Sequence, residues 1–256
     1  MNEPVLIAEN LSAGYGSLVI QHDLNFAIRQ GEVFIIMGGS GCGKSTLLRH
    51  LIGLQAPLAG RVLLHGEDFW AHADEQRAEL QQQFGVLYQN GALWGAMTLH
   101  ENIVLPLTTY RPQLSAAECR ELAEIKLALV GLAGCADLYP AELSGGMRKR
   151  AALARALALD PQVLFFDEPS AGLDPLSSLA LDELILQLRD SLGASIVLVT
   201  HELPSIYRVA DTCLFLDNQT RTQIAYGPLQ QLLEQGPPVV RRFLQRGEGP
   251  AAAEES

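Results

Sequence analysis

The sequence has few basic residues, no long apolar run and no signal-peptide pattern at its start. These features argue in turn against a nucleic-acid-binding protein, a membrane-spanning protein and a secreted protein. Lysine and arginine number 18 against 29 aspartates and glutamates in 256 residues, so the formal net charge is −11. That sign argues against non-specific attachment to nucleic acid or anionic lipid. No stretch approaches the roughly 20 apolar residues that span a bilayer, and Met1 to Pro4 lack a signal-peptide pattern. We therefore expect a cytoplasmic protein that binds no nucleic acid.

Cysteine is also scarce, and the four residues are scattered along the chain: Cys42, Cys119, Cys135 and Cys213. They lack the short paired spacings of a zinc site or a redox motif, so we expect reduced thiols. Three of them should be structural, whereas Cys42 lies in a glycine-rich loop and is the candidate for sensitivity to oxidation.

The sequence does contain enough apolar material for a folded core. Hydrophobic residues make up 48% and charged residues 18%, which excludes wholesale disorder. The length exceeds one average domain and falls short of two, so we expect one compact unit with an added lobe. Short apolar runs separated by helical segments predict the buried strands of an α/β sheet. These runs are Val33–Met37, Arg61–Leu64, Phe84–Leu87, Val163–Phe166, Ser195–Val199 and Cys213–Leu216.

The pattern changes between Thr98 and Leu159, where three helical segments follow one another without a strand. We interpret about residues 92–158 as an inserted helical lobe. Its longest helix is predicted to begin at a capping box formed by Ser115 and Glu118. The apolar stripe of this helix should face the core, and it consists of Leu122, Ile125, Leu129 and Val130.

The end of the chain, 247–256, consists of small and acidic residues. Such residues cannot bury enough surface to become ordered, so we expect a disordered tail. The folded domain is accordingly predicted to span 5–246.

A glycine-rich segment matches the phosphate-binding pattern G-x-x-x-x-G-K-[ST]. It lies between a strand-like and a helix-like segment, which is the context that the pattern requires. Glycines let the backbone fold around a phosphate and present N–H groups to it, and the helix N-terminus favours an anion. Lys44 should reach the β- and γ-phosphates, and Ser45 should hold Mg²⁺. The candidate ATP-binding residues of this loop are Gly38, Gly39, Ser40, Gly41, Cys42, Gly43, Lys44, Ser45 and Thr46.

Two carboxylates follow the apolar strand Val163–Phe166. A strand that ends in Asp167 is suited to ordering Mg²⁺, and Glu168 is placed to polarise the attacking water as a general base. Acidic pairs after strands often only cap the next turn. The phosphate-binding pattern upstream favours the catalytic interpretation.

The segment Leu143–Met147 reads Leu-Ser-Gly-Gly-Met and begins a helix-like run. It resembles the signature of the nucleotide-binding subunits of ATP-binding cassette (ABC) transporters, which is usually Leu-Ser-Gly-Gly-Gln. The sequence departs from that signature at Met147, because methionine cannot form the hydrogen bonds of glutamine. Ser144 and the N–H groups of Gly145 and Gly146 are retained, and they suffice to bind a γ-phosphate at a helix N-terminus.

The resemblance extends over about residues 5–235 and covers the other motifs of the family in order. It implies that Tyr15 stacks on adenine, that Gln89 is the catalytic and metal-binding Q-loop glutamine, and that Asp174 is the D-loop aspartate at the ATP site. His201 is the implied switch histidine. The implied fold is a P-loop NTPase with a RecA-like core, an N-terminal antiparallel β subdomain and an inserted α-helical lobe, and the implied cofactors are ATP and Mg²⁺.

The residues after the signature resemble one branch of the family, the ATPases of the Mla and Mce lipid systems. The signature of that branch also tends to end in methionine and to continue with basic residues, here Arg148, Lys149 and Arg150. Cations in a first helical turn oppose the helix dipole, so helix stability does not explain them. They form either a solvated basic face or an interface with ATP or with a neighbouring subunit.

The segment after Gln89 resembles the same branch. In ABC transporters this region receives a coupling helix of the membrane subunit, and Leu93, Trp94 and Met97 would supply apolar anchors. The alternative is that Trp94 belongs to the core of the helical lobe.

The resemblance also implies an assembly. Two copies of the chain would enclose two ATP molecules, each between the phosphate loop of one copy and the signature helix of the other. The homodimer would lie at the cytoplasmic face of the inner membrane under a permease dimer, with a STAS-domain protein on the ATPase and a periplasmic Mce-domain protein. The cargo would be a phospholipid. An importer of small polar solutes and a soluble ABC ATPase are the alternatives.

Overall fold

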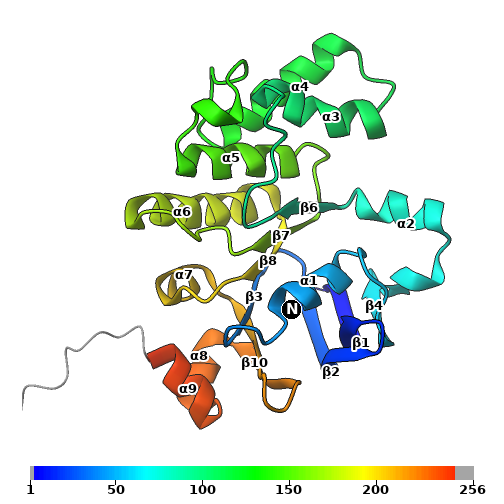
Figure 1. Ribbon diagram of the computed structural model, residues 1–256, viewed down its shortest axis with the longest axis vertical. Helices are drawn as coiled ribbons and strands as arrows, with labels where there is room; N and C mark the ends of the chain where they lie inside the picture. The colour runs from blue at the N-terminus through cyan, green and yellow to red at the C-terminus, as the bar shows by residue number, and fades with distance from the viewer. Residues whose placement is uncertain (1–2, 246–256) are drawn as a thin grey trace, which may run out of the picture.

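Two β-sheets organise the chain in the computed structural model, which describes residues 3–245 (Figure 1). The first sheet has the order β2-β1-β4-β5 and is antiparallel. Its strands are β1 (Pro4–Tyr15), β2 (Leu18–Arg29), β4 (Ala59–Leu64) and β5 (Glu67–Asp68). This sheet is the expected N-terminal β subdomain.

The second sheet has the order β10-β9-β3-β8-β7-β6, in which only β10 is antiparallel to its neighbour. Its strands are β3 (Val33–Gly38), β6 (Phe84–Leu87), β7 (Val163–Asp167), β8 (Ser195–Val199), β9 (Thr212–Leu216) and β10 (Gln223–Pro228). Strand β3 lies between β8 and β9 and is buried on both faces, since its first five residues are 0% exposed. The expected RecA-like parallel core is therefore present.

Helices cover this core and form a separate layer at one end (Figure 1). The layer comprises α3, α4 and α5, which pack on one another and match the expected helical lobe. None of the helices within 3–245 is long and apolar enough to cross a membrane. The helices are α1 (Lys44–Leu51), α2 (Asp74–Gln81), α3 (Leu99–Tyr110), α4 (Ala116–Leu129), α5 (Gly145–Ala156), α6 (Pro175–Leu192), α7 (Leu203–Val209), α8 (Leu229–Gln235) and α9 (Pro238–Gln245).

Two sequence-based expectations about these elements are wrong. The run Arg61–Leu64 is a strand, but it lies in the antiparallel sheet and not in the α/β sheet, because a short apolar run does not encode its partner. In α4 the expected core residues Ile125 and Leu129 are 46% and 40% exposed. The other two members of the expected stripe do face the core, since Val130 is 2% exposed and Leu122 packs against the core. The buried residues of the helix itself are Cys119, Ala123, Lys126 and Leu127. The expected tail at 247–256 lies outside the described residues.

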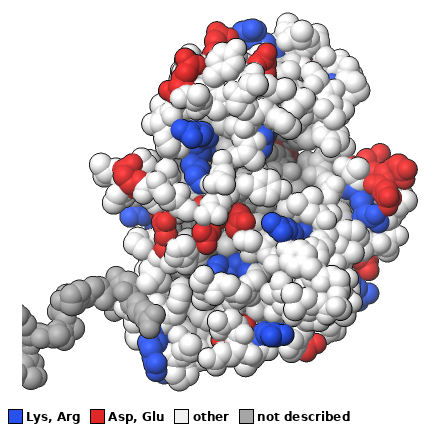
Figure 2. Space-filling model, viewed as in Figure 1, with Lys and Arg blue, Asp and Glu red and all other residues white. Residues whose placement is uncertain are grey.

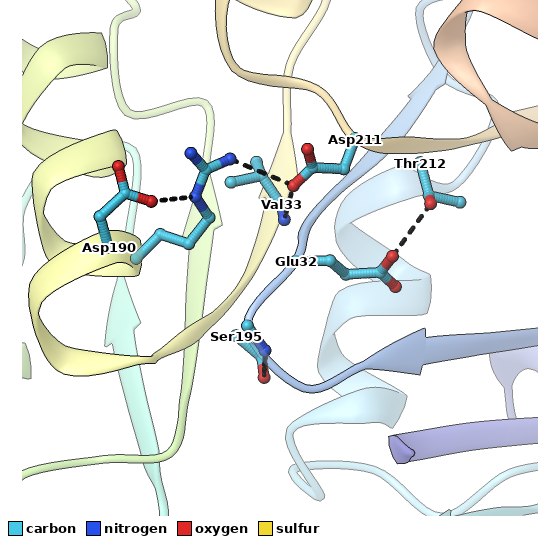
Figure 3. Close-up of polar contacts among 8 residues, drawn as sticks. Glu32, Val33, Asp190, Ser195, Asp211 and Thr212 are labelled. Atoms are coloured by element: carbon cyan, nitrogen blue, oxygen red, sulfur yellow. Dashed lines mark hydrogen bonds and ion pairs between the residues drawn. The ribbon is translucent and has the colours of Figure 1, made fainter. Parts of the chain in front are cut away.

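Asp211 holds the amino end of β3 in place (Figure 3). Its Oδ2 accepts a hydrogen bond of 2.8 Å from the N–H of Val33 and lies 3.3 Å from a guanidinium nitrogen of Arg189 on α6. Arg189 also pairs with its exposed neighbour Asp190 at 2.8 Å. One carboxylate thus ties the central strand to a helix that packs against the sheet.

Glu32 forms a second set of hydrogen bonds at the amino ends of the parallel strands (Figure 3). Its carboxylate accepts hydrogen bonds from the N–H of Arg29 at 2.6 Å and from the hydroxyl of Thr212 at 2.9 Å. Burial raises the pKa of Glu32, and these two hydrogen bonds oppose that rise. Glu32 and Asp211 together anchor the amino ends of β3 and β9.

Replacement of Asp211 should destabilise the fold. Asp211→Ala leaves the buried N–H of Val33 without its acceptor, and such a loss costs about 1–3 kcal/mol of the free energy of unfolding. Asp190→Ala is the matched control, because it removes only an exposed ion pair, which contributes at most about 1 kcal/mol. Urea unfolding measures both. An equal or larger loss in Asp190→Ala would contradict the anchoring role of Asp211.

Candidate functional site

The glycine-rich loop connects β3 to α1 and follows a path that only glycine permits at two positions. A Cβ atom on Gly38 would lie 2.4 Å from the carbonyl oxygen of Leu216, and one on Gly43 would lie 2.5 Å from Cγ2 of Ile20. Gly43 also has a φ angle of 93°, in the left-handed region. The loop therefore passes close to the end of β9 on one side and to β2 on the other.

The end of this loop is the N-terminus of α1, where the first N–H groups have no acceptor within the helix. Gly43 is the N-cap residue and contributes no side-chain cap. Lys44 is only 8% exposed, and its Nζ donates hydrogen bonds of 3.0 Å to the carbonyl oxygens of Gly38 and Gly39. Free N–H groups and a buried cation thus converge on one side of the loop, as an anion site requires.

A cavity of about 720 Å³ lies on that side. The loop supplies most of its wall, and Glu168 and His201 complete the polar part. Its lining residues are Ile20, Gly38, Gly39, Ser40, Gly41, Gly43, Lys44, Ser45, Thr46, Glu168, His201, Leu203 and Phe243. On the face of residues 3–245 that Figure 2 shows, basic side chains are scattered among acidic ones and do not gather into one broad patch.

The two expected magnesium ligands on the core lie side by side. The hydroxyl of Ser45 donates to Oδ1 of Asp167 at 3.0 Å, although 122 residues separate them in the sequence. Burial raises the pKa of Asp167, and the hydrogen bond from Ser45 counteracts this effect. A desolvated carboxylate beside a hydroxyl is a set of hard oxygen donors, so these residues fit Mg²⁺.

Glu168 and His201 also meet at the cavity. Oε1 of Glu168 lies 3.2 Å from Nδ1 of His201, and the N–H of Glu168 donates to the carbonyl oxygen of Val199. Glu168 has a φ angle of 47°, which is unusual for a residue with a side chain. This turn directly after β7 directs the carboxylate into the cavity.

The signature residues lie elsewhere. Ser144 is the N-cap of α5 and accepts a hydrogen bond of 3.2 Å from the N–H of Met147. Within 3–245, neither Ser144 nor Gly145 nor Gly146 lines the cavity at the phosphate loop. Gly145 instead lines a second hollow together with exposed Gln89. A single chain thus presents the two halves of the expected site on separate surfaces.

Asp174 lies outside the cavity as well. It is the N-cap of α6, and its carboxylate accepts hydrogen bonds from the N–H groups of Leu176 and Ser177. Hydrogen bonds from Ser177 lower the pKa of Asp174. Its expected place at an ATP site stays a prediction.

The three cations after the signature bind main-chain oxygens of the same chain. Arg148 donates to the carbonyl oxygen of Leu143 at 3.2 Å, and Arg150 donates to that of Val130 at 3.3 Å. Lys149 is 8% exposed and donates to the carbonyl oxygen of Gln89, so the idea of a solvated face is wrong at this position. Lys149 therefore links the signature helix directly to the Q-loop segment.

Trp94 is 59% exposed, so its assignment to the core of the helical lobe is wrong. Its loop is held by Asn102, a fully buried residue of α3. Oδ1 of Asn102 accepts from the N–H of Trp94 at 2.8 Å, and Nδ2 donates to three carbonyl oxygens of the loop. A loop tied to α3 by four hydrogen bonds thus presents an exposed indole.

Tyr15 and Cys42 differ in their exposure, and the stacking of Tyr15 on adenine stays a prediction. Tyr15 is 39% exposed, and its hydroxyl accepts a hydrogen bond of 2.7 Å from Arg49, so its ring is available at the surface. Cys42 is 1% exposed, and burial raises its pKa. The thiolate is therefore disfavoured, and the structure does not support sensitivity to oxidation. All four cysteines are free, as expected.

Sequence reasoning missed the apolar wall of the cavity. Ile20, Leu203 and Phe243 come from β2, α7 and α9, and none of them belongs to a motif. Ile20 lies about 20 positions before the glycine-rich loop in the sequence, and Phe243 lies some 200 positions after it. Only the folded chain brings these side chains to the loop.

A family model described as "ABC transporter" matches residues 21–171. The chain is 41% identical over 234 residues to the probable ribonucleotide transport ATP-binding protein mkl of Mycobacterium tuberculosis; the match covers 91% of this chain and 64% of that protein. The chain thus spans less than two thirds of that relative. It is 38% identical over 229 residues to the intermembrane phospholipid transport system ATP-binding protein MlaF of Escherichia coli, covering 90% of this chain and 84% of that one.

Solved structures agree with these matches. CbiO1 of Clostridium perfringens, part of the ABC transporter complex cbiONQ, superposes with a TM-score of 0.82 at 26% identity and covers 96% of both chains. An ATP-binding cassette solved as a dimer in a post-hydrolysis state with ADP and Pi gives a TM-score of 0.78 at 28% identity, covering 88% of this chain and 98% of that one. The chain belongs to the ABC transporter family and carries its ATPase domain.

Proposed function

We propose that the chain is the ATP-hydrolysing subunit of an ABC transporter that moves phospholipid between the inner and outer membranes. The meeting of Ser45, Asp167, Glu168 and His201 at the phosphate loop is the observation that carries the ATPase part. The phospholipid part is supported by the similarity to MlaF and by the Mla-like signature that ends in Met147. The similarity to a relative named for ribonucleotide transport favours a small-solute importer as the second candidate.

The phosphate loop would bind the nucleotide through its N–H groups and Lys44. Lys44 is held by two loop carbonyls and would turn to the β- and γ-phosphates. Ser45 and Asp167 would hold Mg²⁺, with Gln89 as a further ligand; the bound metal supplies neutralisation of the phosphate charge. Tyr15 would stack on adenine. The residues proposed to bind ATP and Mg²⁺ therefore come mainly from the phosphate loop, from the first turn of α1 and from the end of β7.

Glu168 is placed to act as the general base on the attacking water. His201 lies on its carboxylate at 3.2 Å and would orient both that carboxylate and the γ-phosphate. Ser144, Gly145 and Gly146 of a second copy would close the site, because they do not reach the cavity of their own chain. We therefore propose a homodimer, as in the dimeric ATP-binding cassette described above.

The proposed surroundings follow the resemblance to the Mla systems. The homodimer would lie at the cytoplasmic face of the inner membrane beneath a permease dimer, with a STAS-domain protein and a periplasmic Mce-domain protein as further partners. Trp94 is exposed and its main chain is hydrogen-bonded to Asn102, which supports a permease contact in the helical lobe.

Glu168→Gln should retain ATP binding and lose at least about 100-fold in the rate of hydrolysis, because a general base contributes 10²- to 10⁴-fold and the phosphate contacts remain. The variant should also sediment as a dimer with ATP and as a monomer without it. Steady-state ATPase assays and sedimentation velocity measure these results.

Two controls accompany this variant. Lys44→Ala should weaken ATP binding itself. Glu202→Gln alters a nearby carboxylate that contacts Ser178 and lies outside the cavity lining, so its ATPase rate should stay within about twofold of wild type. An ATPase rate of Glu168→Gln within a few-fold of wild type would disprove the assignment of the base.

Trp94→Ala should weaken the complex with the permease. An exposed aromatic anchor at an interface contributes about 2 kcal/mol or more, which corresponds to a roughly 30-fold loss of affinity. Tyr110→Ala is the matched control, because Tyr110 is an exposed aromatic at the far end of α3. Binding of each variant to the detergent-solubilised permease measures the effect, and equal affinities would argue against a contact at Trp94.

Loss of the gene should sensitise cells to detergent or chelator while growth on minimal nutrients stays normal, because phospholipid would accumulate in the outer leaflet of the outer membrane. Lys44→Ala should fail to complement the deletion. Met147→Gln should complement at least partly, since Ser144 and the N–H groups retain most of the contacts to the γ-phosphate. An intact barrier combined with a defect in the uptake of one small nutrient would favour the importer instead.

A further inference from the structure

Gln21 is a fully buried polar residue of β2 that no motif includes. Its Nε2 donates hydrogen bonds of 2.7 Å to the carbonyl oxygen of Cys42 in the phosphate loop and of 2.9 Å to that of Asp217 after β9. Both partners only accept, so the amide nitrogen must face them and its orientation is determined. One side chain of the β subdomain thus reaches the loop and the adjacent end of the parallel sheet.

The second amide atom of Gln21 supports a specific role. Oε1 is buried and has no hydrogen-bond partner among the described residues. An unpaired buried oxygen is unfavourable, and an apolar residue of the same shape would avoid it. What Gln21 adds over such a residue is the pair of hydrogen bonds from Nε2.

We propose that Gln21 is a positioning residue for the phosphate loop, whose amide holds the Cys42 carbonyl on one side and thereby directs the N–H of Gly43 into the phosphate cavity. The peptide bond between Cys42 and Gly43 is trans, so its C=O and N–H point in opposite directions. Gly43 lines the cavity, whereas Cys42 and Gln21 line a separate hollow behind the loop. This inference rests on the proposed ATP site.

The hydrogen bond also limits the freedom of Gly43. A glycine with a φ angle of 93° has few steric restraints of its own, so neighbouring groups must fix its peptide planes. Cγ of Gln21 lies 3.5 Å from the Cβ position of Gly43, and Cγ2 of Ile20 lies at 2.5 Å, so β2 also supports the loop by direct packing. Gln21 is the member of this pair that can orient a peptide plane.

The test compares the affinities of ATP and adenosine, each measured as a competitor of a fluorescent ADP. Gln21→Met keeps the shape of the side chain and removes the donor. It should weaken ATP by about tenfold and adenosine by less than twofold, because only ATP uses the N–H groups of the loop. A purely structural role lowers the folded fraction, which reduces both affinities by the same factor and leaves their ratio unchanged.

Gln223→Met is the matched control. The amide of Gln223 also bridges to β2, where it bonds the N–H of Asn25 at 2.9 Å and its carbonyl oxygen at 2.8 Å, but it does not contact the phosphate loop. This variant should leave the ratio of ATP to adenosine affinity at its wild-type value. If Gln21→Met does not fold, Gln21→Asn keeps an amide one methylene short of the loop and should lower the ratio several-fold.

The effects of Lys44→Ala and Gln21→Met on the affinity ratio distinguish a failure of the positioning role of Gln21 from a failure of the proposed ATP site. If Lys44→Ala lowers the affinity ratio and Gln21→Met does not, the positioning role of Gln21 is wrong and the ATP site stands. An equal effect of Gln223→Met would also disprove the role. If Lys44→Ala leaves the ratio unchanged, the proposed ATP site itself is wrong.

Discussion

The complete burial of β3 is the constraint on which the rest of the site depends. Alternate residues of this strand pack into two different cores: Val33, Ile35 and Met37 into the one shared with the helical lobe, and Phe34 and Ile36 into the one shared with the β subdomain. Hydrogen bonds to β8 and β9 hold both of its edges. A strand that is hydrogen-bonded along both edges and packed on both faces delivers the phosphate loop from a fixed point.

The acidic residues at the amino ends of the parallel strands differ in their contacts from those at the carboxyl ends. At the amino ends, Glu32 and Asp211 bind main-chain N–H groups and tie strands to each other and to α6. At the carboxyl ends, Ser45 and Glu168 line a cavity, and Asp167 accepts a hydrogen bond from Ser45. Ligand-binding groups of open α/β sheets commonly lie at this end. The carboxylates of Glu32 and Asp211 at the amino ends thus stabilise the fold, whereas the carboxylate of Glu168 at the carboxyl ends faces the cavity.

The helical lobe keeps its own signature residues away from the phosphate loop, and the cations of α5 show how this lobe is connected to the core. Lys149 donates a hydrogen bond to the carbonyl oxygen of Gln89. A displacement of α5 would therefore move the Q-loop segment or break this hydrogen bond. Trp94 is exposed on the same segment, on a loop held by Asn102. The loop of Trp94, the Q-loop segment and the signature helix therefore form one continuous set of contacts within the chain.

The sequence alone determined the elements whose function requires a local pattern. The glycine-rich loop, the strand that ends in Asp167 and the helical lobe were all predictable, because strand, turn and helix signals are encoded by neighbouring residues. Tertiary structure alone decided which sheet Arg61–Leu64 joins, which face of α4 is buried, and that Ile20, Gln21 and Phe243 lie at the phosphate loop. Those results depend on contacts between residues far apart in the chain, and periodicity and motif spacing carry no information about such contacts.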